Sequence, residues 1–174
     1  MIMLLLLAAA AGAQTITHAQ FRISNKKKGF RSIYLEINKS ILIGINNDGR
    51  IDYIESAQGN SYTLRDMERI GIPIKFYDFS DINDLPGKIK SIGDIAITYN
   101  NVFDIHEQRG TLKSIGDIQI TYYNTFDIHD PQGKIKSVGP VNITYYNTFD
   151  INAPFGYIKS IEGNTDQIQV VAGR

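Results

Sequence analysis

Apolar and polar residues alternate along short segments of this chain, and the alternation returns at a fixed interval. In one such segment Ile95, Ile97 and Tyr99 are separated by Ala96 and Thr98. Side chains on a strand point alternately to the two faces of a sheet, so this order predicts a strand with one apolar and one polar face. Equivalent glycines recur 23 residues apart, at Gly87, Gly110, Gly133 and Gly156. A fixed period of this size is typical of stacked supersecondary units.

Each repeat contains a two-residue turn signal between two apolar runs. The signal is Gly-Asp at 93–94 and 116–117, Gly139-Pro140 in the third copy, and Gly163-Asn164 at the end. Such a pair predicts a two-residue hairpin loop. The proline selects the turn type, because a type I′ turn needs a positive φ at both central residues and proline cannot adopt one. A type II′ turn needs a positive φ only at the first position, which is glycine in every copy.

A second turn signal ends at the glycine that marks the period, as in Asp130-Pro131-Gln132-Gly133, and favours a type I turn. Pairing the flanking strands around this four-residue loop predicts Asp104 opposite Lys113 and Ile105 opposite Leu112. Opposite charges in register would fix the alignment of each hairpin. The same register gives the pairs Asp81–Lys90, Asp127–Lys136 and Asp150–Lys159.

We therefore expect an all-β fold, an antiparallel meander of tandem 23-residue β-hairpin repeats that forms a curved or rolled sheet. The alternative is a parallel β-solenoid with one coil per repeat, which would stack the repeated lysines about 4.8 Å apart. Like charges at that spacing repel, so the charge pattern favours the meander. One contact distinguishes the two folds. Tyr122 would pack directly on Tyr99 and Tyr145 in the solenoid, but not in the meander.

The remaining positions are less regular. Ile89 and Ile92 are three residues apart, which indicates a β-bulge at Lys90-Ser91 or coverage of both sheet faces. Residues 63–70 fit either a helical turn or a repeat strand. Strands are expected at 21–24, 30–37, 41–45 and 50–55, with a hairpin turn at 46–49. Clear repeats occupy 87–161, degenerate copies reach upstream to about residue 67 and arguably to Gly49, and residues 14–174 are expected to form a single domain.

The N-terminus has the pattern of a signal peptide. Residues 1–10 are almost wholly apolar, and Ala11-Gly12-Ala13 fits a small-residue cleavage site. We expect residues 1–13 to be removed and the protein to be exported, to the periplasm or the exterior of a Gram-negative bacterium. No later segment is apolar enough to span a membrane as a helix. The 18 basic and 18 acidic residues balance, which argues against a nucleic-acid partner.

No catalytic or cofactor-binding motif is visible. With no cysteine, disulfides and thiolate chemistry are excluded. His106 and His129 precede a turn where Asn83 and Asn152 stand in the flanking copies, which favours a turn-entry role over a metal site. The repeated aspartates have lysine partners in the proposed register, which favours structural pairing over the paired carboxylates of a glycoside hydrolase. We expect no enzymatic activity, no cofactor and no metal.

The tyrosines are the best binding candidates. Consecutive tyrosines on a strand point to opposite faces, so one of each pair would pack inward and the other outward. An aromatic row of this kind is either cross-strand packing or a platform for a glycan or a partner protein. The row would comprise Tyr99, Tyr122, Tyr123, Tyr145 and Tyr146, flanked by Asn124, Asn147 and Gln119.

The repeated motifs GKIKSIG and ITYYNTFDI resemble those of uncharacterised secreted β-repeat proteins of Bacteroidetes-type bacteria, over residues 67–163. The resemblance implies export and a repeat β fold, without a known activity. A weaker similarity to the YD repeats of RHS-type proteins rests on Tyr/Phe-Asp, a turn, and Gly-Lys-hydrophobic. The sequence favours a non-enzymatic protein that binds a glycan or a protein at the cell envelope. A self-assembling module joined through sheet edges is the second hypothesis, and a small secreted hydrolase the third.

Overall fold

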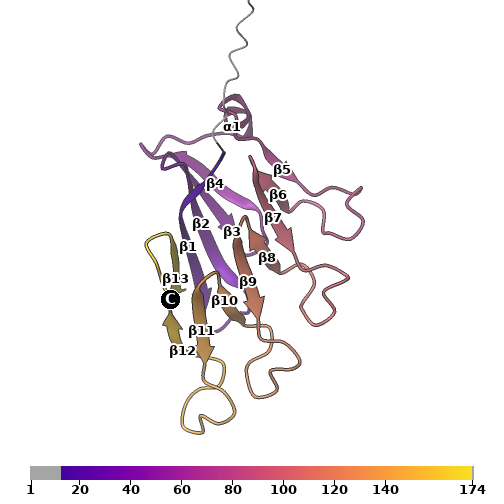
Figure 1. Cartoon of the computed structure of the whole chain (residues 1–174), viewed down its shortest axis with the longest axis vertical. Helices are drawn as coiled ribbons and strands as arrows, with labels where there is room; N and C mark the ends of the chain where they lie inside the picture. Colours follow the sequence, from indigo (N-terminus) through magenta and orange to yellow (C-terminus); the bar gives the residue numbers. More distant parts are fainter. Residues whose placement is uncertain (1–12, 174) are drawn as a thin grey trace, which may run out of the picture.

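The computed structural model describes residues 13–173, which form two β-sheets lying against each other (Figure 1). The signal-peptide prediction for residues 1–13 falls almost entirely outside this range. Among the described residues no helix has the length and apolar character needed to cross a bilayer.

The first sheet has five strands. They are β1 (Ile16–Ser24), β2 (Phe30–Ile37), β3 (Ile41–Asn46), β4 (Ile51–Ser56) and β13 (Ile168–Gly173). Strands β1 to β4 are an antiparallel meander, whereas β13 returns from the end of the chain and pairs in parallel with β1. The strands expected before residue 56, and the hairpin turn at 46–49, are therefore confirmed. Strand β4 belongs to this sheet, so the repeat array does not reach back to Gly49.

Residues 63–70 are helical. The helix α1 (Leu64–Arg69) begins after Thr63, whose hydroxyl accepts a hydrogen bond from the Asp66 N–H at 3.3 Å. The Asp66 carboxylate in turn accepts from the Thr63 N–H at 2.9 Å, which completes a capping box. The side chain of Met67, in this helix, is fully buried.

The second sheet contains the repeats. Its eight strands follow one another across the sheet in chain order, each antiparallel to its neighbours (Figure 1). The strands are β5 (Ile74–Phe76), β6 (Ile89–Ile92), β7 (Ile95–Tyr99), β8 (Leu112–Ile115), β9 (Ile118–Tyr122), β10 (Ile135–Val138), β11 (Val141–Tyr145) and β12 (Ile158–Glu162). This meander confirms the predicted fold class. Because β8 lies between β7 and β9, Tyr99 and Tyr122 are not in adjacent strands, and the solenoid is excluded.

The two-residue turns are confirmed in three of the four copies. Gly93, Gly116 and Gly139 have φ values of 55°, 54° and 52°, and the residue after each does not share a positive φ, as type II′ requires. The prediction is wrong for Gly163-Asn164. There the chain leaves β12 and crosses to the first sheet, where the Asn164 carboxamide accepts from the Val170 N–H at 2.7 Å.

The strand register predicted from the four-residue turns is wrong. Tyr99 pairs with Leu112, so the segment between them is a loop of residues 100–111, and Ile105 lies in this loop rather than opposite Leu112. The predicted ion pairs nevertheless form, with Nζ–Oδ1 distances of 2.6, 2.7, 2.8 and 2.8 Å for Lys90–Asp81, Lys113–Asp104, Lys136–Asp127 and Lys159–Asp150. The loop folds back over the strand and brings each aspartate to its lysine.

The predicted bulge occurs in every copy. Lys75 pairs with Ser91 and Phe76 with Ile89, so Lys90 is left without a partner in the ladder. The extra residue lets Ile89 and Ile92 both point inward, and each is fully buried. The lysine of each ion pair is thus the bulged residue, which places its side chain on the outer surface.

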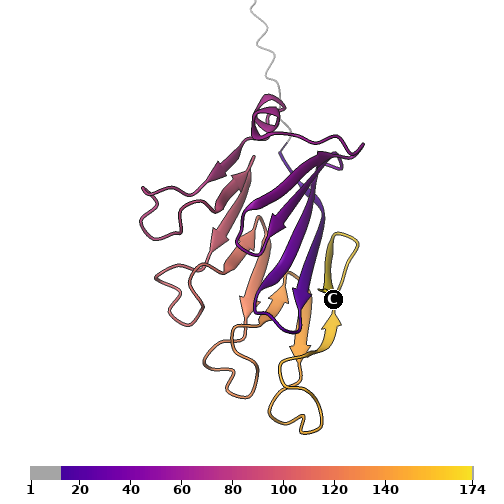
Figure 2. The ribbon, with the colours of Figure 1, turned by 180° about the vertical axis from the view of Figure 1, so that it is seen from behind.

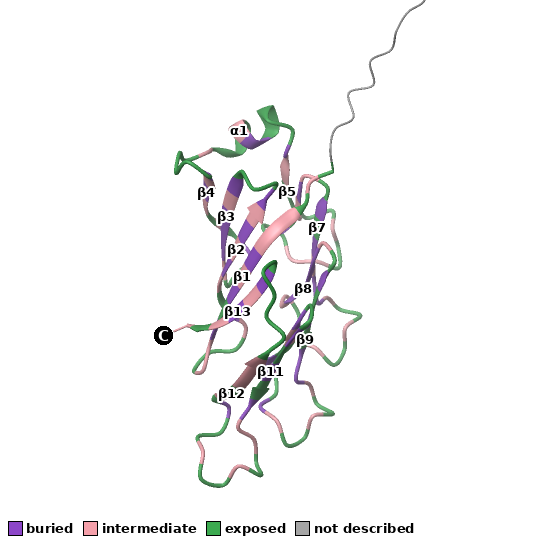
Figure 3. Cartoon of the chain, turned by 60° about the vertical axis from the view of Figure 1, so that its left-hand side comes forward, coloured by how far each residue is buried: buried purple, intermediate pink, exposed green. Residues whose placement is uncertain are grey.

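The apolar faces of the two sheets form one core. Isoleucines of the repeats pack against Phe21, Leu35 and Ile43 of the first sheet, and Figures 2 and 3 show the sheets as two stacked layers. The repeat sheet stays open, with β5 and β12 as its edge strands, and its apolar face is buried against the first sheet. The residues before the repeats, together with β13, supply a separate sheet that covers the apolar face.

Candidate functional site

Four loops of similar shape project from one side of the eight-stranded sheet (Figure 1). They connect β5 to β6, β7 to β8, β9 to β10 and β11 to β12, and span residues 77–88, 100–111, 123–134 and 146–157. We refer to their outer surface as the loop face. Twelve residues is far more than a hairpin needs, and long ordered loops often carry function.

Each loop is held by its own polar side chains. In the third loop the Asn124 carboxamide accepts from the Phe126 N–H at 3.0 Å, and the Asp127 carboxylate accepts from the Asn124 N–H at 2.9 Å. The second Asp127 oxygen accepts from Lys136 Nζ at 2.8 Å. The Lys136 bond is the main cause that lowers the pKa of Asp127, with help from the backbone donor. Equivalent bonds fix the other three loops.

These bonds hold apolar side chains out in solvent. Phe103, Phe126 and Phe149 occupy equivalent positions and are 74%, 72% and 69% exposed. The isoleucine two positions later is exposed in all four loops, at Ile82, Ile105, Ile128 and Ile151. Contiguous exposed apolar residues on a folded surface mark interaction sites. The loop face therefore presents a row of aromatic and aliphatic groups.

Neighbouring loops are tied to one another. The rings of His106 and Phe126 lie 4.6 Å apart, and those of His129 and Phe149 lie 4.4 Å apart. The Asn124 carboxamide donates to Glu107 Oε1 at 3.2 Å. Asn147 makes the matching bond to Asp130 at 3.1 Å. The row is thus organised before any partner arrives.

The tyrosines of the predicted aromatic row are mostly buried, as cross-strand packing requires. Tyr99, Tyr122 and Tyr145 end their strands and face the five-stranded sheet, and burial raises the pKa of each. Tyr123 is also buried, because its ring packs edge-on against Tyr145 and its hydroxyl donates to the Ile143 carbonyl at 3.0 Å. Only Tyr146 of this set is half-buried.

The expectation that one tyrosine of each pair points outward is therefore wrong for Tyr122 and Tyr123. Strand β9 ends at Tyr122, so Tyr123 belongs to the loop and strand alternation no longer sets its direction. The candidate asparagines Asn124 and Asn147 are the residues that build the loops and join them. Gln119 is exposed on the outer face of β9, away from this row.

The exposed phenylalanines were not singled out from the sequence. The predicted four-residue turn places Phe-Asp-Ile in a strand. The spacing Asn-x-x-Asp in three loops, and Asp-x-x-Asp in the first, is the signal that a structured loop begins there. Within residues 13–173, no three His, Asp or Glu side chains are grouped as a metal site would require.

Comparison with protein-family models, curated proteins and solved structures found no match for this chain.

Proposed function

We propose that this protein is an exported, non-enzymatic binding protein whose loop face docks a partner protein with an apolar, basic surface. The observation that carries the proposal is the row of exposed Phe and Ile side chains, repeated in register and fixed by hydrogen bonds. Support for export comes from the sequence pattern of residues 1–13 alone.

The composition of the row favours protein over glycan. Aliphatic isoleucine lies beside each phenylalanine position, whereas sugar platforms rely on flat rings with polar edges. The rings of Phe126 and Phe149 already lie against histidine rings, so docking would cost these two side chains little entropy. Burying one Phe ring at an interface contributes about 2 kcal/mol.

The charges of the loops favour a basic partner. Asp78, Asp84, Glu107 and Asp130 make no salt bridge with any described residue. Lys88 and Lys134 donate to backbone carbonyls in turns of the five-stranded sheet, which leaves Arg109 as the loop cation set against these four acidic side chains. Two copies of this face would bring like charges together, which disfavours self-docking.

Assembly through a sheet edge has less support. The first residue of the edge strand β12, Ile158, already donates its N–H to the Asn25 carboxamide at 2.8 Å. Part of the backbone edge that a second copy would need is therefore occupied.

The chain itself suggests the test. Ser80 stands where the other loops carry Phe103, Phe126 and Phe149, yet its loop keeps the same ion pair. A triple Phe→Ser variant should therefore fold. We expect the wild type, and a Leu64→Ser control altered at a distant exposed position, to retain one defined protein from the producing cell's envelope proteins.

The triple variant should bind that protein at least thirtyfold more weakly, and the wild-type complex should weaken at high salt. Glycan-array binding that is lost in the triple variant would show that the partner is a glycan. Self-association in sedimentation that is lost in the same variant would show that the partner is a second copy. Equal retention by the wild type and the triple variant would overturn the proposal.

A further inference from the structure

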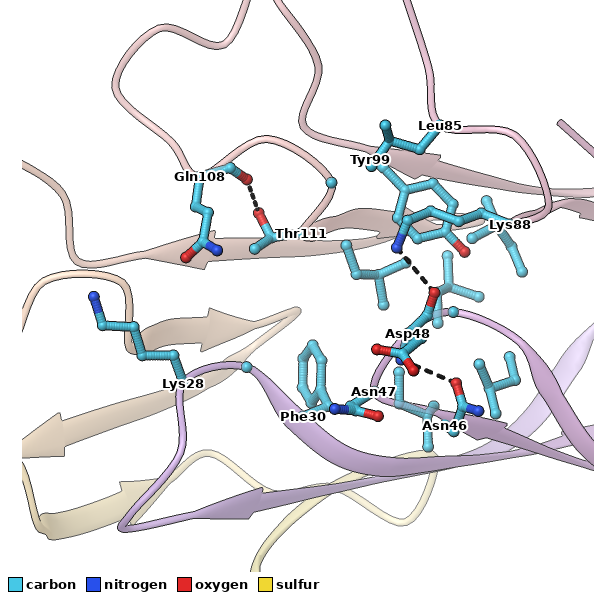
Figure 4. A pocket seen from close by; sticks show the side chains of 18 of the residues that line it. Lys28, Phe30, Asn46, Asn47, Asp48, Leu85, Lys88, Tyr99, Gln108 and Thr111 are labelled. Carbon is cyan, nitrogen blue, oxygen red and sulfur yellow. Dashed lines mark hydrogen bonds between the residues drawn. The ribbon is translucent and has the colours of Figure 1, made fainter. Parts of the chain in front are cut away.

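A cavity of about 280 Å³ lies between the two sheets, near the base of the loops (Figure 4). One wall is formed by β2, β3 and the turn at 46–49, and the other by β7, β8 and loop residues 108–111. This volume is just below the range of about 300–1,000 Å³ that is usual for small-molecule sites.

The inner surface of the cavity is apolar. Phe30, Ile33 and Ile45 come from the five-stranded sheet, and Ile97, Leu112 and Ile115 from the eight-stranded sheet. The rings of Tyr99 and Tyr122 complete it. Gly49 lets Tyr99 approach the turn, since a Cβ there would lie 2.7 Å from the tyrosine hydroxyl.

Two tyrosine hydroxyls reach this surface, and the cavity is also lined by Asn46, Asn47, Gln108 and Thr111. The Tyr122 hydroxyl donates to the Leu112 carbonyl at 2.8 Å. The Tyr99 hydroxyl makes no hydrogen bond with another described residue, although the side chain is only 4% exposed. No buried polar side-chain atom of the described residues lacks a partner, so this hydroxyl is reached by solvent and is free to bond water or a bound molecule.

The rim of the cavity is cationic. Lys28, Lys88 and Arg109 line it with one carboxylate, Asp48, which is a net charge of 3 − 1 = +2. None of these four side chains forms a salt bridge with another described residue. Lys88 lies over the Tyr99 ring at 4.7 Å and donates to the Asp48 carbonyl at 2.9 Å. Burial lowers the pKa of Lys88.

We propose that this cavity binds a small amphipathic carboxylate, with its apolar body between the sheets and its carboxylate against Lys28 and Arg109. At ~30 Å³ for each water-sized group, the volume holds roughly nine non-hydrogen atoms. Octanoate, with about ten, fits if its carboxylate remains at the rim. The rim charge explains the preference for an anion, and the two isoleucine-rich walls explain the preference for a hydrocarbon chain.

The test is calorimetric titration of the full chain with octanoate, hexanoate and octan-1-ol. Octanoate should saturate one site, and hexanoate should bind about sixteenfold more weakly, because each methylene removed weakens binding about fourfold. The double variant Lys28→Gln with Arg109→Gln should weaken octanoate about tenfold and leave octan-1-ol unchanged. Lys27→Gln, in the same turn but outside the cavity, is the matched control.

The rim variants replace exposed side chains, so folding should be preserved. Ile33→Phe should fill the cavity and abolish binding of both octanoate and octan-1-ol, with circular dichroism to verify the fold. Absence of saturable octanoate binding to the wild type would overturn the proposal, as would octanoate binding that the rim variant leaves unchanged. The triple Phe→Ser variant of the loop face should still bind octanoate, so failure of one proposal does not affect the other.

Discussion

Lys134 joins the two sheets, and its removal is the sharpest test of how they are held together. The residue leaves the third repeat loop and is 8% exposed. Its ammonium donates to the carbonyls of Asn25 and Lys27 at 2.6 and 3.0 Å, with a longer contact to Ser24 at 3.4 Å. These carbonyls belong to the turn between β1 and β2.

The expected effect of Lys134→Met follows from these contacts. A hydrogen bond to a charged group contributes about 1.5–3 kcal/mol, so the two short bonds together contribute at most about 3–6 kcal/mol. Burial opposes this, because desolvation lowers the pKa of Lys134 and thus penalises the charged amine. Water can also reach the carbonyls of an exposed turn. We expect a net loss of about 2–3 kcal/mol in the free energy of unfolding.

Urea unfolding measures this loss. With a slope of about 2 kcal/mol per molar, the midpoint should fall by about 1 M. The control is Lys136→Met, which removes a lysine two positions away whose ion pair with Asp127 is on the surface and contributes at most about 1 kcal/mol. The free energies of unfolding of the two variants could differ by less than about 0.5 kcal/mol, or Lys134→Met could be more stable than the wild type. Either result would refute the claim that the Lys134 hydrogen bonds hold the two sheets together.

Two further predictions concern the repeats. Asp117→Pro copies the native Gly139-Pro140 turn and should leave the melting temperature unchanged or raise it, whereas Gly116→Ala should cost about 1–2 kcal/mol because φ is 54° there; equal melting temperatures would contradict the type II′ assignment. The four ion-paired aspartates have pKa values below their ordinary 3.8, chiefly through their lysine partners, so the stability they add is present above that pH and is lost on further acidification. The urea midpoint should therefore fall more steeply from pH 4 to pH 2 in the wild type than in a variant with Asn at 81, 104, 127 and 150, and parallel slopes would refute the role of these pairs.

Local signals in the sequence were sufficient for the repeat strands. The positive φ of Gly93 and Gly116 follows from the proline after Gly139. Equivalent repeats adopt the same turn, and the proline allows only a type II′ turn, in which the glycine has a positive φ. The bulge at Lys90 follows from the spacing of two isoleucines. These features depend on neighbours within a few residues, which the sequence displays directly.

Other features depend on contacts between residues far apart in the sequence, or on the route that the chain takes between two strands. Nothing near Ile168 indicates that it will pair with Ala19, at the other end of the chain. The ion pair of Asp104 and Lys113 was predicted from a hairpin, yet a folded-back loop makes the same contact. The folded-back loop exposes Phe103 and Ile105 to solvent. The four-residue turn predicted in its place puts both residues in a strand, so the candidate binding surface could not be predicted.

The parallel pairing of β13 with β1 limits how many repeats this architecture can hold. The link from β12 to β13 is residues 163–167, and β1 stays fixed in the first sheet. Inserting one more 23-residue unit would move β12 sideways by two strand spacings, or about 10 Å, while β13 kept its place. Unequal crossing-over between the nearly identical repeats would therefore produce chains that lose this closing strand or need a longer link. In open-ended repeat proteins the number of repeats changes freely. Here the pairing of β13 with β1 restricts the number of repeats that the second sheet can hold.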